Sequence, residues 1–186
     1  MQYLTKGQRG VVYTDQNKEI IIKIGEEFRI KNEAIWLEKL NKYNIGPKLI
    51  KHQENYLVLK YIKGKQVSEY FKEVNKQQII NIIKEILKQC RTLDKLKVNK
   101  LEMNHPFKHI LIENKKPIMI DFEKCTLTEN TKNVTQFFQY LMSNNLEQIF
   151  NKKSISINKK EFIKKLKNYK DNNSDENFSN LLSLIK

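Results

Sequence analysis

The hydrophobic pattern of the chain changes near Gly64, and this change limits the folds that the chain can adopt. Before Gly64, short apolar runs are bounded by turn signals, which is typical of β-strands. The turn signal at 15–18 separates two such runs, so we expect a hairpin there. Residues 27–43 differ, because their apolar residues recur at helical spacing until Gly46 and Pro47 end the pattern.

After Gly64, apolar residues recur mainly at helical spacing. The patterns predict helices over 67–74, 76–96, 133–149 and 159–169, and two strands within 103–121. We therefore expect an α+β fold. Its single domain, residues 1–186, would have a sheet-containing part over 1–64 and a reduced, mostly helical part over 65–186.

The length of 186 residues is enough to bury a real core. No apolar stretch reaches the roughly 18 residues that span a bilayer, and the N-terminus lacks a signal-peptide layout, so we expect no membrane association. Cys90 and Cys125 are the only cysteines and do not form a CxxC pair. We expect reduced thiols, no zinc site and a cytoplasmic protein.

The net charge of +14 raises the question of a polyanionic partner such as RNA. The charge comes almost entirely from 32 lysines, because Arg9, Arg29 and Arg91 are the only arginines. Specific reading of bases favours arginine, and the lysines are scattered among many asparagines and isoleucines. The coding bias of an AT-rich genome produces the same pattern. We expect only weak, non-specific binding to RNA or other polyanions.

Several residues are of the types that phosphate chemistry needs. In GQRGVVY, Gly7 and Gly10 would let the backbone approach a phosphate, although an ordinary hairpin turn explains the same glycines. Lys23 lies inside the apolar strand EIIIKIG and needs a partner, unless it reaches water at an edge. Glu33 is a candidate partner or part of a solvated helix face. Asp121 follows an apolar run and is either a metal ligand or a turn residue.

The order of these elements resembles that of protein kinase-like phosphotransferases: a glycine-containing hairpin, a strand lysine, a helix glutamate, a connecting strand, a loop and a strand ending in Asp-Phe. Over residues 3–141 the chain resembles a minimal archaeal-type predicted serine/threonine protein kinase, related to the RIO kinases and to the kinase of the KEOPS complex. The resemblance implies a two-lobed fold. Its small N-lobe would hold an antiparallel sheet plus one helix, and its C-lobe would be reduced and mostly helical.

The resemblance also implies an ATP site. Gly7 and Gly10 would lie over the phosphates, with Thr5 in place of the first of the usual three glycines. Val12 would pack on the adenine. The backbone of a connecting segment would receive the adenine edge, through Lys60, Tyr61 and Ile62.

The same resemblance implies the charged groups around the phosphates. Lys23 would hold the α- and β-phosphates and pair with Glu33. Asp121 matches the Asp of the Asp-Phe-Gly segment and would bind Mg²⁺ or Mn²⁺, while Glu123 replaces the glycine.

The catalytic loop departs from the family pattern, which has an Asp base and, five residues later, a metal-binding Asn. Aligning the apolar pair at 110–111 puts Asn104 at the base position and His109 at the metal position. Asn104 cannot accept a proton, and His109 is a poorer magnesium ligand than oxygen. The alternatives are that His105 or Lys108 serves as a base or a phosphate contact, or that the His-Pro pair only shapes the loop.

These assignments predict an ATP-dependent atypical kinase that transfers the γ-phosphate to a Ser/Thr hydroxyl of a protein substrate or of itself. The alternative is a nucleotide-binding pseudokinase scaffold that binds a protein partner in a larger complex, with or without RNA, and Asn104 favours it. A small-molecule kinase of the aminoglycoside type shares the fold, although the small second lobe argues against it. An RNA-associated protein that uses its lysines is a further alternative.

Overall fold

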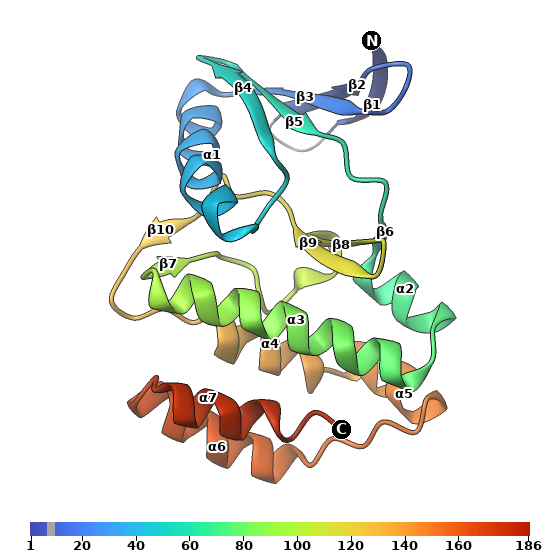
Figure 1. Cartoon of the computed structure of the whole chain (residues 1–186), viewed down its shortest axis with the longest axis vertical. Helices are drawn as coiled ribbons and strands as arrows, with labels where there is room; N and C mark the ends of the chain where they lie inside the picture. Colours follow the sequence, from blue (N-terminus) through green and yellow to red (C-terminus); the bar gives the residue numbers. More distant parts are fainter. Residues whose placement is uncertain (7–9) are drawn as a thin grey trace.

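A five-stranded antiparallel sheet forms the upper part of the molecule (Figure 1). The computed structural model describes residues 1–6 and 10–186. In spatial order the strands are β1 (Gln2–Lys6), β2 (Gly10–Thr14), β3 (Ile20–Gly25), β5 (Tyr56–Lys60) and β4 (Leu49–Gln53). Helix α1 (Glu27–Leu40) and a 3-10 turn, Asn41–Tyr43, connect β3 to β4.

The lower part of the molecule consists of helices (Figure 1). They are α2 (Val67–Glu73), α3 (Lys76–Lys95), α4 (Asn133–Leu141), α5 (Asn144–Lys152), α6 (Lys159–Asp171) and α7 (Asp175–Leu182). Within the described ranges, no helix combines the length and the apolar composition needed to cross a membrane.

Two small sheets lie between the upper sheet and the helices (Figure 1). One contains β6 (Lys65–Gln66), β8 (Ile110–Glu113) and β9 (Lys116–Met119), and the other pairs β7 (Val98–Asn99) with β10 (Thr126–Leu127). A 3-10 turn, Pro106–Lys108, precedes β8. The loops that leave β7 and β9 therefore meet beneath the upper sheet.

Helix α3 is the central helix of the lower part, and its sequence explains where it begins. Asn75 accepts a hydrogen bond from the backbone N–H of Gln78, whose side chain accepts one in return from the backbone N–H of Asn75. Its apolar stripe is buried, from Ile79 to Leu93. A capping box and a buried stripe together explain why this helix was readily predicted.

A buried polar network ties the later helices to α3. The Asp94 carboxylate accepts hydrogen bonds from the side chains of Asn133 at 2.7 Å and Tyr169 at 3.0 Å. The guanidinium of Arg91 donates to the Tyr169 hydroxyl at 3.0 Å and to Asp175 at 3.1 Å. Because α3, α4, α6 and α7 each contribute to this network, it orients the C-terminal helices against α3.

The side chains on the face of the upper sheet opposite α1 are mostly apolar, whereas an antiparallel sheet that packs on one side usually has polar residues on the other. The inner face packs on α1, and there Leu57 and Leu59 are buried. The register assigns the opposite side chains to what we call the outer face: Tyr3, Lys6, Val11, Tyr13, Ile20, Ile22, Ile24, Lys51, Gln53, Tyr56, Val58 and Lys60. None of these twelve residues is buried.

The α+β prediction is confirmed, as are the hairpin at 15–18 and helices within 27–43 and 76–96. The stretch 133–149 is helical but divided, because α4 ends at Leu141 and α5 starts after Ser143. Ser143 has an extended backbone, with φ −75° and ψ 153°, so the second helix begins anew at this residue.

Candidate functional site

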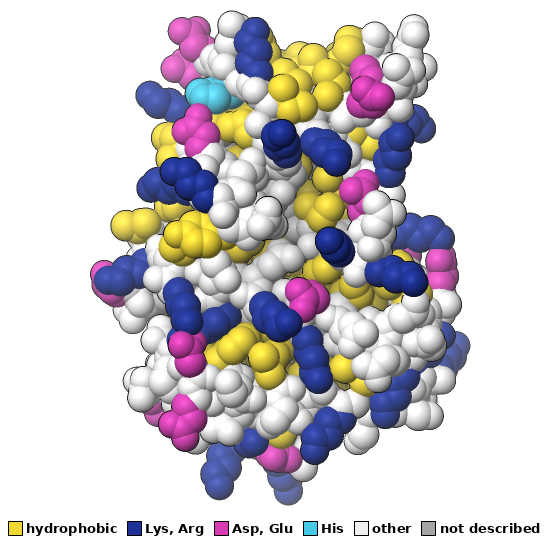
Figure 2. All heavy atoms as spheres, viewed as in Figure 1, with side chains coloured by type: hydrophobic (Ala, Val, Ile, Leu, Met, Phe, Trp, Pro, Cys, Tyr) yellow, Lys and Arg dark blue, Asp and Glu magenta, His cyan; other side chains and the backbone are white. Residues whose placement is uncertain are grey.

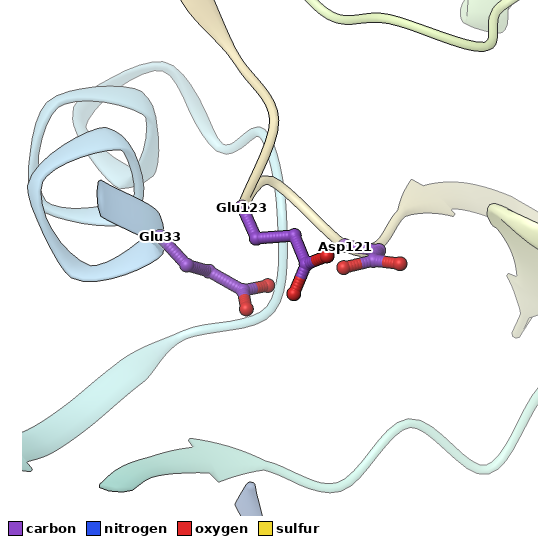
Figure 3. Close-up of side chains that lie close together, drawn as sticks. All are labelled: Glu33, Asp121 and Glu123. Atoms are coloured by element: carbon purple, nitrogen blue, oxygen red, sulfur yellow. The ribbon is translucent and has the colours of Figure 1, made fainter. Parts of the chain in front are cut away.

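Lys23 lies at the centre of a cluster of three carboxylates. Its Nζ lies 2.7 Å from Glu33 Oε2, 2.9 Å from Asp121 Oδ1 and 3.4 Å from Glu123 Oε2. Figure 3 shows the three acidic side chains pointing toward one another, Glu33 from α1 and the other two from the segment after β9. The predicted ion pair between Lys23 and Glu33 is confirmed, and Asp121 and Glu123 extend it to the lower part of the molecule.

Glu33 connects this cluster to the backbone beside Asp121. Only 2% of its side chain is exposed, and its second oxygen accepts a hydrogen bond from the backbone N–H of Phe122 at 3.1 Å. Phe122 itself is fully buried. Helix α1 and the Asp-Phe segment are therefore fixed to each other by a charged hydrogen bond.

The charges of the cluster shift the pKa values of its members in opposite directions. Burial alone would lower the pKa of Lys23, but the nearby charges of Glu33 and Asp121 raise it well above its ordinary value. Burial would raise the pKa of Asp121, yet the charge and hydrogen bond of Lys23 lower it. Both groups are thus charged near neutral pH.

The backbone of Asp121 is held in a left-handed conformation by a buried lysine that the sequence analysis missed. Asp121 has φ 66°, and its carbonyl oxygen accepts a hydrogen bond from Lys100 Nζ at 2.6 Å. The same ammonium lies 4.8 Å from the centre of the Phe122 ring. Burial lowers the pKa of Lys100. Lys100 therefore positions the Asp-Phe segment from below, opposite Lys23.

The three clustered carboxylates do not form a ready metal site, because a lysine already occupies their centre. The group Glu33, Asp121 and Glu123 has ligand atoms within 4.8 Å of one another. Lys23 contacts all three, and Arg29 Nη1 lies 3.5 Å from Glu123 Oε1. The oxygen suited to a cation is Asp121 Oδ2, since the Asp121 side chain is 37% exposed and its other oxygen binds Lys23.

Glu102, which the sequence analysis did not single out, lies in a row with His109 and Asp121. Glu102 Oε2 lies 3.4 Å from His109 Nε2, and His109 Nδ1 lies 3.7 Å from Asp121 Oδ2. Lys124 donates to Glu102 at 2.7 Å, and this hydrogen bond lowers the pKa of Glu102. Burial lowers the pKa of His109. A carboxylate, a largely neutral imidazole and a second carboxylate thus form one row.

The other loop residues chosen from the sequence do not contact Asp121, although the backbone N–H of His105 donates to the carbonyl oxygen of Glu102 at 2.9 Å. Asn104 is half-buried, while His105 and Lys108 are exposed. The ammonium of Lys108 lies 5.6 Å from the centre of the Phe107 ring. Among the described residues, no hydrogen bond or ion pair links Asn104, His105 or Lys108 to Asp121.

Only part of the predicted glycine loop lies within the described residues. Gly7 lies outside the described residues. Gly10 pairs with Gly25 in the sheet, where a Cβ atom would collide with the carbonyl oxygen of Ile24. The packing of two strands thus accounts for this glycine. Val12 lies directly opposite Lys23 in the register, so both side chains project from the inner face.

The segment predicted to receive adenine follows β5 directly. The backbone N–H groups of Lys60 and Tyr61 already donate to the carbonyl oxygens of Lys48 and Glu19, at 2.9 and 2.8 Å. Ile62 is half-buried. Of the three predicted N–H groups, that of Ile62 is therefore the one suited to an adenine nitrogen.

Comparisons with known proteins give one distant relative. The chain is 31% identical over 77 residues to an uncharacterized protein of Methanocaldococcus jannaschii. This match covers 41% of the chain and 66% of the relative, which is just under two thirds of the relative's length. No protein-family model matches the sequence.

Proposed function

We propose that the protein is an ATP-dependent phosphotransferase with a two-lobed, kinase-like arrangement, acting on a Ser/Thr hydroxyl of a protein or of itself. The observation that carries the proposal is the ion-pair cluster of Lys23. One ammonium bridges a buried helix glutamate, Glu33, and a half-exposed aspartate, Asp121, from the other part of the chain. Phosphoryl transfer relies on such positioned charges more than on covalent chemistry.

ATP would bind beneath the inner face of the sheet. Lys23 would turn from Asp121 to the α- and β-phosphates while keeping its contact with Glu33. Val12 lies opposite Lys23 on this face and would contact the adenine, whose edge would receive the N–H of Ile62. Gly7 and Gly10 would cover the phosphates.

Mg²⁺ or Mn²⁺ fits this site only as a partner of the nucleotide. Asp121 Oδ2 offers one hard oxygen, and Mg²⁺ commonly combines one or two carboxylates with phosphate oxygens and water. His109, 3.7 Å from this oxygen, is the second residue proposed for the metal. When bound, the ion would neutralise charge that develops on the phosphates.

The geometry favours Glu102 over Asn104 as the general base. Glu102 is a carboxylate and can accept a proton, which an amide cannot. It is connected to Asp121 through His109, whereas Asn104 has no such connection among the described contacts. Lys124 keeps Glu102 ionised near neutral pH. Glu102 would then accept the proton of the attacking hydroxyl.

A nucleotide-binding scaffold is the second candidate function. The residues His109 and Asn104 at the expected metal and base positions favour it. The scaffold would bind ATP through Lys23 and Asp121 without transferring phosphate. A protein partner, in a complex with or without RNA, would then recognise the closed form.

Incubation of the whole chain with γ-labelled ATP and Mg²⁺ or Mn²⁺ separates these functions. We expect transfer to the chain itself or to a generic acceptor such as casein, and its loss in Lys23→Met. Lys31→Met removes an exposed lysine of the neighbouring helix and should leave transfer unchanged. Nucleotide binding without any transfer favours the scaffold, and absence of nucleotide binding in wild type refutes both functions.

Variants of the loop identify the base in the same assay. Glu102→Gln should reduce the transfer rate about 10²-fold or more, as expected for a general base. Asn104→Asp should leave the rate unchanged if Glu102 is the base, and should increase it if residue 104 faces the acceptor. A lower rate in His105→Ala with no effect of Glu102→Gln would assign the role to His105.

A further inference from the structure

The outer face of the upper sheet has the composition of a protein interface rather than of a solvated surface. Eight of its twelve residues are Tyr, Val or Ile, three are Lys and one is Gln. Tyr3 is 61% exposed and Ile24 is 39% exposed. Figure 2 shows hydrophobic side chains gathered at the top of the molecule, over this sheet. The solvated face of a sheet normally carries polar residues, which alternate along each strand with the apolar residues of the covered face. A contiguous exposed apolar patch marks an interaction site.

The charges on this face lie at its margins. Lys6 is on β1 and Lys51 on β4, which are the two edge strands, and Lys60 is at the end of β5. The twelve positions of the outer face include no acidic residue. Glu19 and Glu54 lie in the adjoining turns. An apolar centre with a basic rim on both edges complements a partner that has an apolar centre and acidic flanks.

We propose that the outer face binds an acidic amphipathic helix of a partner protein. The five strands span about 19 Å from β1 to β4, at about 4.8 Å between neighbours. A helix of about 14 residues is about 21 Å long and would cover this width. The apolar stripe of the helix would lie on the cross-strand row that Tyr13, Ile22 and Val58 form. The carboxylates of the helix would reach the lysines at either edge of the sheet.

Two other occupants fit the observations less well. A second copy of the chain would bring another net charge of +14 against the same basic rim. Single-stranded RNA would match the lysines and the three tyrosines, but the centre of the face is made of branched aliphatic side chains, which do not stack on bases as aromatic rings do. The acidic helix satisfies both the apolar centre and the basic rim.

The test selects, from a peptide library, helices that bind to the intact chain. The probe is a phage-displayed library of 14-residue helices with leucines on one face and Glu, Lys or Gln at each polar position. We expect Glu to exceed Lys at least fivefold at the polar positions of the first and last turns, which would lie over the two edge strands. The variant in which Lys6, Lys51 and Lys60 are all changed to Glu should select Lys instead. Reversing three exposed lysines of α6 (Lys160, Lys164 and Lys167) is the control with the same net charge, and it should still select Glu.

The apolar part is tested with a matched pair of double variants. Tyr3→Ser/Ile24→Ser should weaken a selected helix at least tenfold. Phe28→Ser/Ile35→Ser changes side chains of similar exposure on α1, 63% and 42%, and should alter binding less than twofold. Equal effects of the two double variants overturn the proposal, as does a library from which no helix is enriched.

Two further outcomes also overturn it. A 12-nucleotide oligo(U) whose binding is lost in Tyr3→Ser/Ile24→Ser but not in the α1 control would make the face a nucleic-acid platform. A wild-type dimer in sedimentation equilibrium that the same outer-face variant dissociates would make the occupant a second copy.

Discussion

Glu33→Gln should change stability in opposite directions depending on whether Lys23 is present. In the wild type, the Glu33 carboxylate binds Lys23 at 2.7 Å, and Glu33 is 2% exposed. Replacing it with an amide removes one hydrogen bond between charged groups, which costs about 1.5–3 kcal/mol of unfolding free energy. The amide oxygen can still accept the N–H of Phe122, so the loss should lie in this range rather than above it.

Lys23→Met should be the more damaging single change. It leaves Glu33, Asp121 and Glu123 without the ammonium that contacts all three. Breaking a buried ion pair by removing one partner typically costs about 3–5 kcal/mol, because the other charge stays buried. In this background Glu33→Gln removes the uncompensated buried charge. The second substitution should therefore regain about 1–3 kcal/mol instead of losing a similar amount.

Urea unfolding at pH 7, followed by tryptophan fluorescence and by circular dichroism, measures all four proteins of the cycle. Coinciding curves from the two probes would support treating the transition as two-state. Lys23→Arg is the control that retains the charge, and it should cost less than Lys23→Met. If Glu33→Gln destabilises the wild type and Lys23→Met by the same amount, Lys23 is not the counter-charge of Glu33 and the proposed cluster is wrong.

The remaining predictions concern Tyr140, Gly46 and Asp121. The hydroxyl of Tyr140 is buried without a hydrogen-bond partner among the described residues. Tyr140→Phe should therefore increase the free energy of unfolding, measured in urea, by about 1 kcal/mol. Tyr169→Phe breaks a buried hydrogen-bond network and should lower the free energy of unfolding instead. Burial raises the pKa of Tyr140 from 10.0 to about 12. The contribution of this group to the stability of the wild type is therefore fully present below pH 10 and is lost as the pH rises through 12. Tyr140→Phe should reduce this loss of stability at alkaline pH. Gly46 has φ +84°, and a Cβ atom there would lie 2.7 Å from a Leu37 methyl, so Gly46→Ala should lower the midpoint of thermal unfolding by several degrees. Asp121→Asn should abolish the Mg²⁺ dependence of ATP binding in calorimetry, and an unchanged dependence would place the metal elsewhere.

The elements and residues that the sequence predicted well share a local signal. Lys23 stands out because a charged residue interrupts an apolar strand, and Asp121 because it ends one. Both signals need no knowledge of the tertiary structure. Helix α3 could be predicted for the same reason, since its apolar stripe and its capping box lie within one continuous stretch.

The role of Lys100 could not be predicted, because it depends on a contact between segments far apart in the sequence. Lysine is rarely fully buried, and a lysine just after a two-residue strand gives no periodic signal. Its function becomes visible only when Asp121 takes a left-handed backbone whose carbonyl points to the ammonium. The outer face escaped prediction for a different reason. Side chains of a strand alternate between its two faces, so a covered face is normally recognised by its apolar residues. Where residues on both faces are apolar, as in IIIKI, this alternation does not indicate which face is covered.

The proposal of Glu102 in place of Asn104 as the base depends on contacts that a count along the chain does not include. Counting back five residues from His109 reaches Asn104, on the assumption that the loop has the usual length. The 3-10 turn Pro106–Lys108 lies within this loop, and the residue that contacts His109 is Glu102, seven positions away. Glu102 has φ 72°, a conformation that costs free energy for a residue with a side chain. Such strain persists where the surrounding contacts hold it, here the ion pair to Lys124 and the contact with the imidazole of His109. We therefore propose Glu102 as the base, because its carboxylate can accept a proton and contacts His109, whereas the amide of Asn104 cannot accept one.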